Sequence, residues 1–464
     1  MYHLTNFKLV ILGMLLASSA VLHAAESSKT VELHTKPDNN LIVIQNIAGK
    51  ITLSPSSDSM IHITGTAKAQ AKNQKKADEL LESIGFDEEK FDDKTVISVS
   101  YPLDDYTGII YNPDDKASSW NWGGQSSSKY MGQKVRVARK AKGVFSKWAE
   151  VYADLNIAIP AGQKSKVRVI SGQIDANNIN NDLSLDSSSG KINVNDSRGR
   201  LSADTGSGKI TIENFTGDID ADTGSGSIVL TNINGSADAD TGSGSIKINK
   251  VTGNVKADTG SGSVTVNDYL GGELIEIDTG SGGVRINGDL GNVNNLEIDT
   301  GSGSVKIVST HAPSLKIDID TGSGGIHVDL PDLQVKRDKR GTFIGTVGDG
   351  KGRASIDTGS GSVSFKMDDS YESVAKPVSG NDKSKSDRAK NTGKPNPELA
   401  TKVQAALNKD EDIRNANLEV SAVGSRAIIA GSMDSVWDIA KAVKIVNDVE
   451  GVDNVSVDLE LNED

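Results

Sequence analysis

The sequence predicts a mainly β protein: a parallel β-solenoid with coils of about 18–21 residues, followed by a small C-terminal α+β domain. Three observations carry this prediction. The pentapeptide Asp-Thr-Gly-Ser-Gly occurs eight times. Apolar and polar residues alternate in short runs between the copies, which is typical of short strands with one buried face. Aromatic residues make up only 4% of the chain and glycines number 48, so Ile, Val, Leu and Ala must fill a narrow core.

Residues 1–25 have the pattern of a secretory signal peptide. Lys8 precedes the apolar run LVILGMLLASSAVL, and small residues follow at Ala24 and Ala25. We therefore expect an exported protein. The chain has no cysteine, which excludes disulfides, a thiol nucleophile and a lipid-accepting Cys. No later apolar run is long enough to span a bilayer, and the net charge of −13 argues against nucleic acid as a partner.

Residues 26–165 are expected to form an N-terminal β region that caps the solenoid. A helix is predicted over 73–86, because Ala77, Leu80, Leu81 and Ile84 fall on one helical face that would pack over the end of the solenoid. A cap is needed because an uncovered last coil is an open sheet edge. Solenoid-type strands are predicted at 41–53, 60–69 and 95–103, and a strand at 150–162 leads into the coils.

The segment 101–130 holds six aromatic residues in a polar context: Tyr101, Tyr106, Tyr111, Trp120, Trp122 and Tyr130. Two interpretations remain open. The rings are buried in a loop folded over the solenoid, or they are exposed and bind a sugar or a partner surface.

The repeat region is assigned to 166–369. The motif begins at Asp204, Asp222, Asp240, Asp258, Asp278, Asp299, Asp320 and Asp357, and a degenerate copy begins at Asp186. One unit is too small to bury its own apolar face, so equivalent strands should pair in parallel and inward residues should form columns. Around the copy at Asp222, Ala221 and Ile228 are expected to enter the core.

The motif itself is predicted to be a corner of the coil. Asp would accept hydrogen bonds from nearby backbone N–H groups, and the two glycines would adopt positive φ. Ser and Thr hydroxyls would bridge to the equivalent residue of the coil above or below. Stacking would also align the carboxylates roughly 5 Å apart, where like charges repel by about 1 kcal/mol in water. Two features could offset this repulsion: backbone N–H donors in the turn, or a row of bound cations such as Ca²⁺. The nine-residue repeat of known calcium-binding β-rolls is absent from this sequence.

Motifs that suggest catalysis have structural explanations. A pepsin-like protease needs two Asp-Thr-Gly loops from two lobes, whereas each copy here precedes one short strand. The segment 345–352 begins like a phosphate-binding loop but has Gly352 where Ser or Thr is required. The six histidines show no metal-ligand spacing. We therefore assign no catalytic, cofactor-binding or metal-ligating residue.

Residues 370–396 are rich in Lys, Ser, Gly and Pro and predict a flexible linker. Residues 397–464 change character. An amphipathic helix, a hairpin, a second helix and a final strand are expected there, in the order α-β-β-α-β.

Two resemblances cover most of the chain. The segments NIAGKITL, NIAIPAG and VISGQIDA and the motif coils resemble the bacterial putative-adhesin β-helix family, a domain of unknown function. The C-terminal segments LATKVQAAL, AIIAGSM and VEGVDNVSV, with Gly424, Gly431 and Gly451, resemble a BON domain. The second resemblance implies a Gram-negative envelope location and phospholipid or partner binding. This segment has 14 acidic and 6 basic residues, which disfavours anionic lipid headgroups.

The expected function is that of a non-enzymatic cell-envelope protein, adhesin-like or scaffolding, in the periplasm or at the outer membrane or cell surface. Its partner would be an envelope component, a glycan or a protein. The alternative is a carbohydrate-active β-helix enzyme or a glycan-binding protein.

Overall fold

The computed structural model describes residues 25–37, 41–113, 125–139 and 147–368, and residues 396–461 with gaps at 411–412, 415–416, 424, 434–435, 448 and 453. The chain divides into two units, one through Tyr371 and one from Glu372. Residues 1–24 of the expected signal peptide and nearly all of the expected linker lie outside the described residues.

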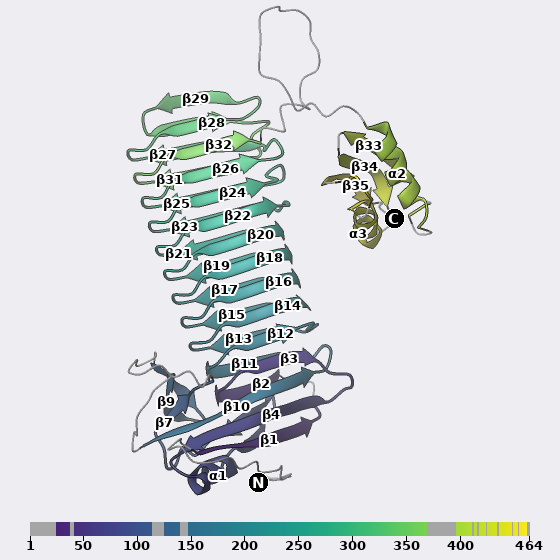
Figure 1. Ribbon diagram of the computed structural model, residues 1–464. Coiled ribbons are helices and arrows are strands. Elements are labelled where there is room, and N and C mark those ends of the chain that lie inside the picture. Colours follow the sequence, from purple (N-terminus) through teal and green to yellow (C-terminus); the bar gives the residue numbers. More distant parts are fainter. Residues whose placement is uncertain are drawn as a thin grey trace, which may run out of the picture. The chain divides into compact units, whose positions relative to one another are not determined.

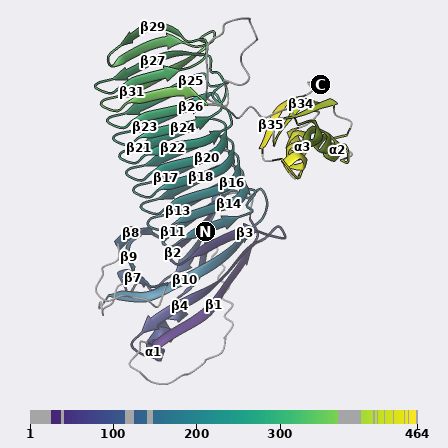
Figure 2. The same ribbon diagram turned by 45° about the horizontal axis from the view of Figure 1, so that its top comes forward.

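The first unit is a stack of two-stranded coils (Figures 1 and 2). In one coil, β17 (Ile219–Thr223) precedes the motif corner and β18 (Ile228–Asn234) follows it. β17 pairs in parallel with the strand 18 residues later, with Ile219 opposite Ala237. Alternate residues of each strand are buried, so equivalent apolar side chains form columns between the two sheets. The parallel β-solenoid predicted from the repeat is confirmed.

Strands that end in the Asp-Thr of the motif belong to what we call the motif sheet; the other sheet is the opposite sheet. The motif sheet contains β2 (Leu41–Ala48), β5 (Gly85–Lys90), β6 (Lys94–Ser100), β11 (Ser165–Ser171), β13 (Leu183–Ser187), β15 (Leu201–Thr205), β17, β19 (Ala237–Thr241), β21 (Val255–Thr259), β23 (Leu274–Thr279), β25 (Asn295–Thr300), β27 (Leu315–Thr321), β29 (Gln334–Lys339), β30 (Thr342–Thr346) and β31 (Gly352–Thr358). The opposite sheet contains β1 (Ala25–Thr35), β3 (Ile51–Pro55), β4 (Ile61–Ala71), β7 (Gly108–Tyr111), β8 (Gln125–Tyr130), β9 (Gln133–Arg139), β10 (Trp148–Ile159), β12 (Ile174–Asn177), β14 (Ile192–Arg198), β16 (Ile210–Thr216), β18, β20 (Ile246–Thr252), β22 (Val264–Tyr269), β24 (Val284–Gly288), β26 (Val305–Ser309), β28 (Ile326–Asp329) and β32 (Val363–Met367).

The parallel stack begins upstream of the motif copies. β2 pairs in parallel with β11, and β3 pairs in parallel with β12, so residues 41–55 form a coil next to the first repeat coil. The strand expected at 60–69 is β4, and it differs from a solenoid strand. It pairs antiparallel with both β1 and β10, because the chain reverses after β3 instead of completing another coil.

At the other end, the last motif copy in the sequence is not the last in space. β31 lies between β25 and β27 in parallel register, and β32 lies between β26 and β28. The coil of Asp357 therefore stacks between those of Asp299 and Asp320. The hairpin of β29 and β30 closes the motif sheet in antiparallel fashion. All six residues of β29, QVKRDK, are exposed, and such charged side chains oppose edge-to-edge pairing.

Helix α1 (Gln74–Glu82) packs against β1 and β4. Its buried residues are Ala77, Leu80 and Leu81, which lie on the predicted face. Asn73 caps the first turn by accepting a hydrogen bond from the Lys76 N–H, at 2.9 Å. The helix therefore covers the N-terminal part of the unit, as Figure 1 shows.

Three of the four described tyrosines in the segment 101–130 are buried, and Tyr106 is half-buried against the core. Tyr101, Tyr111 and Tyr130 are at most 8% exposed, and the Tyr101 hydroxyl donates to Asn46 Oδ1 at 2.7 Å. Burial raises the pKa of both Tyr101 and Tyr130. Trp120 and Trp122 lie outside the described residues. The described tyrosines thus support the interpretation as core residues.

The second unit has the predicted order: α2 (Pro397–Leu407), β33 (Asn417–Val423), β34 (Arg426–Met433), α3 (Val436–Asn447) and β35 (Asn454–Leu461). β34 is the middle strand, antiparallel to β33 and parallel to β35. Leu399, Val403 and Leu407 are buried on one face of α2. None of the helices in the described ranges of either unit is long and apolar enough to cross a membrane.

Candidate functional site

The threonine of the motif links each corner to the neighbouring coil in every copy but that of Asp320, where the Thr321 hydroxyl donates to the Gly324 carbonyl of its own coil at 2.8 Å. Thr223 Oγ1 donates to the Gly208 carbonyl of the preceding coil at 3.0 Å and accepts from the Gly226 N–H of its own coil at 3.1 Å. The same pair of bonds is made by Ser187, Thr205, Thr241, Thr259, Thr279, Thr300 and Thr358. The expectation that Asp closes the turn is therefore wrong. Thr points inward and Asp outward, because side chains alternate along the strand.

The motif glycines are required for close approach and not for positive φ. An added Cβ on Gly226 would lie 1.7 Å from the Gly208 carbonyl oxygen. Neither Gly224 nor Gly226 has positive φ, which corrects our expectation. Positive φ occurs instead at the other corner of the coil, for example at Asn232 (57°) and Gly235 (147°). Hydrogen-bonded backbones thus come too close at the motif for any side chain.

The motif aspartates form a continuous ladder on the outer face of the motif sheet. Each is paired in register with the next, in the spatial order Asp186, Asp204, Asp222, Asp240, Asp258, Asp278, Asp299, Asp357 and Asp320. We call these nine residues the aspartate ladder. Arg168 ends it, with its Nε 3.2 Å from Asp186 Oδ2. Within the described part of the chain, no hydrogen bond reaches the carboxylates of the eight Asp-Thr-Gly-Ser-Gly copies.

A second row of charges lies beside the ladder, two residues earlier in each strand. It contains Asp220, Asp238, Lys256, Glu276 and Glu297. Lys256 Nζ is 2.9 Å from Glu276 Oε2. The outer face of the opposite sheet differs in character: it carries asparagine pairs such as Asn195–Asn177 (3.1 Å) and the exposed basic residues Lys247, Arg285 and Lys306. The continuous row of acidic side chains therefore lies on the motif sheet.

The ladder carboxylates repel one another. Partial burial, and then the neighbouring Asp204 and Asp220, raise the pKa of Asp222. Partial burial is also the larger cause that raises the pKa of Asp240 and of Asp258. The smaller cause is the charge of the preceding ladder residue, Asp222 for Asp240 and Asp240 for Asp258. Solvent exposure limits this repulsion, because water and salt screen exposed charges. The backbone donors that we expected to compensate the carboxylates do not contact them.

The raised pKa values give a testable pH dependence. A folded pKa above the unfolded value means that the folded state binds more protons, so this stabilisation is complete below about pH 3.8 and is lost as pH rises through the folded pKa. The stability of the triple variant Asp222→Asn, Asp240→Asn, Asp258→Asn should not fall in this way as pH rises, because asparagine does not ionise. At neutral pH and low salt it should be more stable than wild type by less than about 1 kcal/mol. Urea unfolding at acidic and neutral pH measures the difference, and a triple variant less stable at neutral pH would contradict it.

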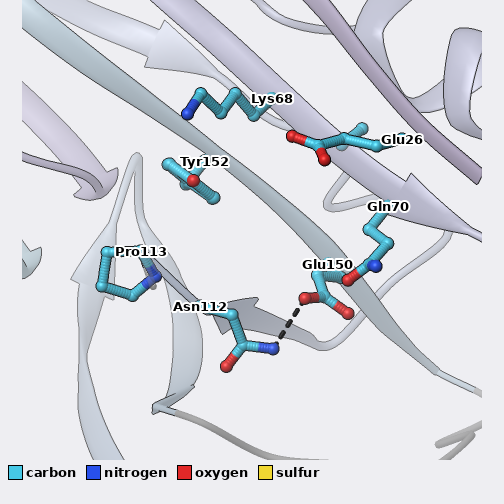
Figure 3. Close-up of a pocket in the computed structure, with 8 residues that line it drawn as sticks. Glu26, Lys68, Gln70, Asn112, Pro113, Glu150 and Tyr152 are labelled. Carbon is cyan, nitrogen blue, oxygen red and sulfur yellow. Dashed lines mark hydrogen bonds between the residues drawn. The ribbon is translucent and has the colours of Figure 1, made fainter. Parts of the chain in front are cut away.

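The described surface of the first unit includes two polar hollows. The first, of about 90 Å³, is lined by Glu26, Lys68, Gln70, Asn112, Pro113, Glu150 and Tyr152 (Figure 3). Asn112 Nδ2 donates to Glu150 Oε1 at 2.6 Å. The second, of about 530 Å³, lies at the widened corners and includes Glu273, Asn294, Ser314 and Lys351. Small-molecule sites usually have roughly 300–1,000 Å³. The first hollow is lined by two carboxylates, but it is too small for a typical small-molecule ligand. The second hollow is large enough, but only one carboxylate lines it.

The segment 345–352 is a turn, as expected. It joins β30 to β31, with positive φ at Gly348 and Gly350. Asp349 Oδ2 lies 2.9 Å from Lys351 Nζ, and hydrogen bonds from Ser314 and then Lys351 lower the pKa of Asp349 to about 2. Lys351 is thus paired with a residue of its own turn.

Inspection of histidine spacing missed one contact. His34 and His62 are 28 residues apart in the sequence but face each other across β1 and β4. No set of three or more His, Cys, Asp or Glu arranged for a common ion occurs among the described residues.

Comparison with known proteins gives two family matches. The Toastrack DUF4097 model matches residues 39–269 and 268–366, and the BON domain model matches residues 396–463. No curated protein matches the chain. One similar solved structure is that of a putative cell adhesion protein from Clostridium sporogenes, with 12% sequence identity and a TM-score of 0.18. The alignment covers 74% of this chain and 100% of that chain.

Proposed function

Because the chain belongs to the Toastrack DUF4097 family and carries a BON domain, we propose that it is an exported, non-enzymatic protein of the cell envelope. The solenoid displays a binding surface, and the BON domain docks to an envelope component, a protein or a phospholipid. The proposed location is the periplasm or the outer membrane or cell surface. The apolar run of residues 1–25 supports export.

One observation carries the scaffold proposal: the motif that dominates the sequence builds the fold and leaves its carboxylates outward in an uninterrupted ladder. Short coils with minimal corners give flat sheet faces, which suit contact with an extended partner surface. Between Ser202 and Asp299 the two charged rows hold ten carboxylates and one ammonium group. Such a field favours partners with basic surfaces, and the exposed carboxylates can also accept hydrogen bonds from hydroxyl groups.

The alternative function is a carbohydrate-active enzyme, since other β-helices cleave glycans. Glycoside hydrolysis commonly uses two carboxylates that flank the scissile bond. The larger hollow has only Glu273, and Glu150 in the smaller hollow is engaged by Asn112. These features favour binding without cleavage.

A glycan array combined with a reducing-end assay on the full chain tests the proposal. We expect binding without product release, and weaker binding by the triple variant Asp222→Asn, Asp240→Asn, Asp258→Asn. The matched control is Glu213→Gln, which removes one exposed carboxylate from the opposite sheet. Release of new reducing ends by the wild-type protein would overturn the non-enzymatic proposal.

Cell fractionation tests the location separately. The protein should appear in the periplasmic or membrane fraction, in a form shortened by about 25 residues if the signal pattern is processed. A full-length protein retained in the cytosol would contradict export. Neither result depends on the identity of the ligand.

A further inference from the structure

Two imidazoles meet on the solvent-facing side of the antiparallel pair β1 and β4. His34 lies directly opposite His62 in the register, and their Nδ1 atoms are 2.6 Å apart. The ring centroids are 4.7 Å apart with an interplanar angle of 69°. Both side chains remain accessible, at 44% and 31% exposure, so a dissolved ion reaches them.

Each ring is held from behind by a carboxylate. His34 Nε2 contacts Glu32 Oε1, and His62 Nε2 lies 2.9 Å from Asp58 Oδ1. Asp58 is fixed in turn, because the Met60 N–H donates to it at 2.8 Å and the Ser56 hydroxyl donates at 3.0 Å. Aspartate is normally ionised at neutral pH and then only accepts hydrogen bonds.

These contacts determine where the imidazole protons lie. An ionised carboxylate only accepts hydrogen bonds, so each Nε2 carries the proton. A neutral imidazole then has a lone pair on Nδ1, and the two lone pairs of His34 and His62 face each other. Two acceptors at this distance repel each other unless a shared proton or a metal ion lies between them. A carboxylate on the far nitrogen is also the usual second-shell partner of a metal-bound histidine.

We propose that His34 and His62 bind a divalent metal ion that prefers imidazole, of the Zn²⁺ class, through their two Nδ1 atoms. Glu32 and Asp58 are the positioning residues, and water completes the coordination. Zn–N distances of about 2.0–2.1 Å in tetrahedral geometry place two nitrogens about 3.3 Å apart. The rings must therefore separate by roughly 0.7 Å, which exposed side chains permit. This site is independent of the aspartate ladder and of the proposed envelope function.

Calorimetric titration of the full chain, without an affinity tag, with ZnCl₂ tests the proposal above the ordinary imidazole pKa of about 6.5. We expect one saturable equivalent that is lost in His34→Gln and in His62→Gln. Asp58→Asn should weaken binding by about 10–100-fold, as for other second-shell partners. All three changes are at accessible positions, and unchanged thermal midpoints without zinc will show that the variants are folded.

The matched control is His311→Gln. His311 also has a carboxylate partner, with its Nδ1 3.1 Å from Asp289 Oδ2, but among the described residues it contacts no second imidazole. Its loss should leave zinc binding unchanged. The proposal is overturned if wild type and the His34→Gln, His62→Gln double variant take up equal zinc. It is also overturned if proton NMR shows the pair sharing one proton, with no zinc-dependent shift of either ring.

Discussion

Replacing Gly282 by alanine should destabilise the solenoid by roughly 3 kcal/mol or more, because the new Cβ would lie 1.7 Å from the Gly262 carbonyl oxygen. That oxygen is backbone, and it accepts the Thr279 hydroxyl at 2.9 Å. Relief requires separating two hydrogen-bonded coils in the middle of the stack. Urea unfolding followed by circular dichroism measures the loss.

Gly325→Ala is the control for this substitution. Gly325 directly follows the second motif glycine of its coil, in the position that Gly283 has after Gly282. A Cβ added to Gly325 would meet nothing within 4 Å. Neither Gly282 nor Gly325 has positive φ, so alanine changes backbone preference similarly at both positions. Equal stability of the two variants would refute close coil approach as the reason for the motif glycines.

Replacing Thr241 by valine should cost roughly 2–4 kcal/mol with almost no change in volume. The Thr241 hydroxyl is fully buried. It donates to the Gly226 carbonyl at 2.8 Å and accepts from the Gly244 N–H at 3.1 Å. Valine leaves both backbone groups without this partner. The free energy of unfolding from denaturant titration measures the cost.

Thr241→Ser provides the matched comparison, since Ser187 makes the same two bonds in the degenerate copy. Serine keeps the hydroxyl and removes one methyl group, so the loss should be about 1 kcal/mol. A serine variant as unstable as the valine variant would show that the methyl group, and not the hydroxyl, holds the corner.

The buried face of the coil followed from the sequence because strand side chains alternate strictly. The predicted inward residues Ala221 and Ile228 are at most 1% exposed. The same alternation places the Asp222 side chain outward and the Thr223 side chain inward. The sequence pattern therefore already indicated that threonine, and not aspartate, makes the buried contacts of the corner. We instead assigned the turn by the usual preference of Asp for turns, which tertiary stacking overrides here.

Non-local pairing was not accessible from the sequence. The 37-residue interval before Asp357 did not reveal that β31 inserts between β25 and β27. Nor did histidine spacing indicate that His34 faces His62. Both depend on register between distant strands, which no local pattern specifies.

The central claim is that the motif threonines link neighbouring coils by hydrogen bonds, whereas the motif aspartates point outward and are not needed for the fold. Thermal unfolding of two triple variants in the same three coils tests it most directly: Asp→Asn at Asp222, Asp240 and Asp258, and Thr→Val at Thr223, Thr241 and Thr259. We predict that the asparagine variant unfolds at or above the wild-type midpoint and that the valine variant unfolds far below it or fails to fold. An asparagine variant that loses the fold while the valine variant keeps it would contradict the claim.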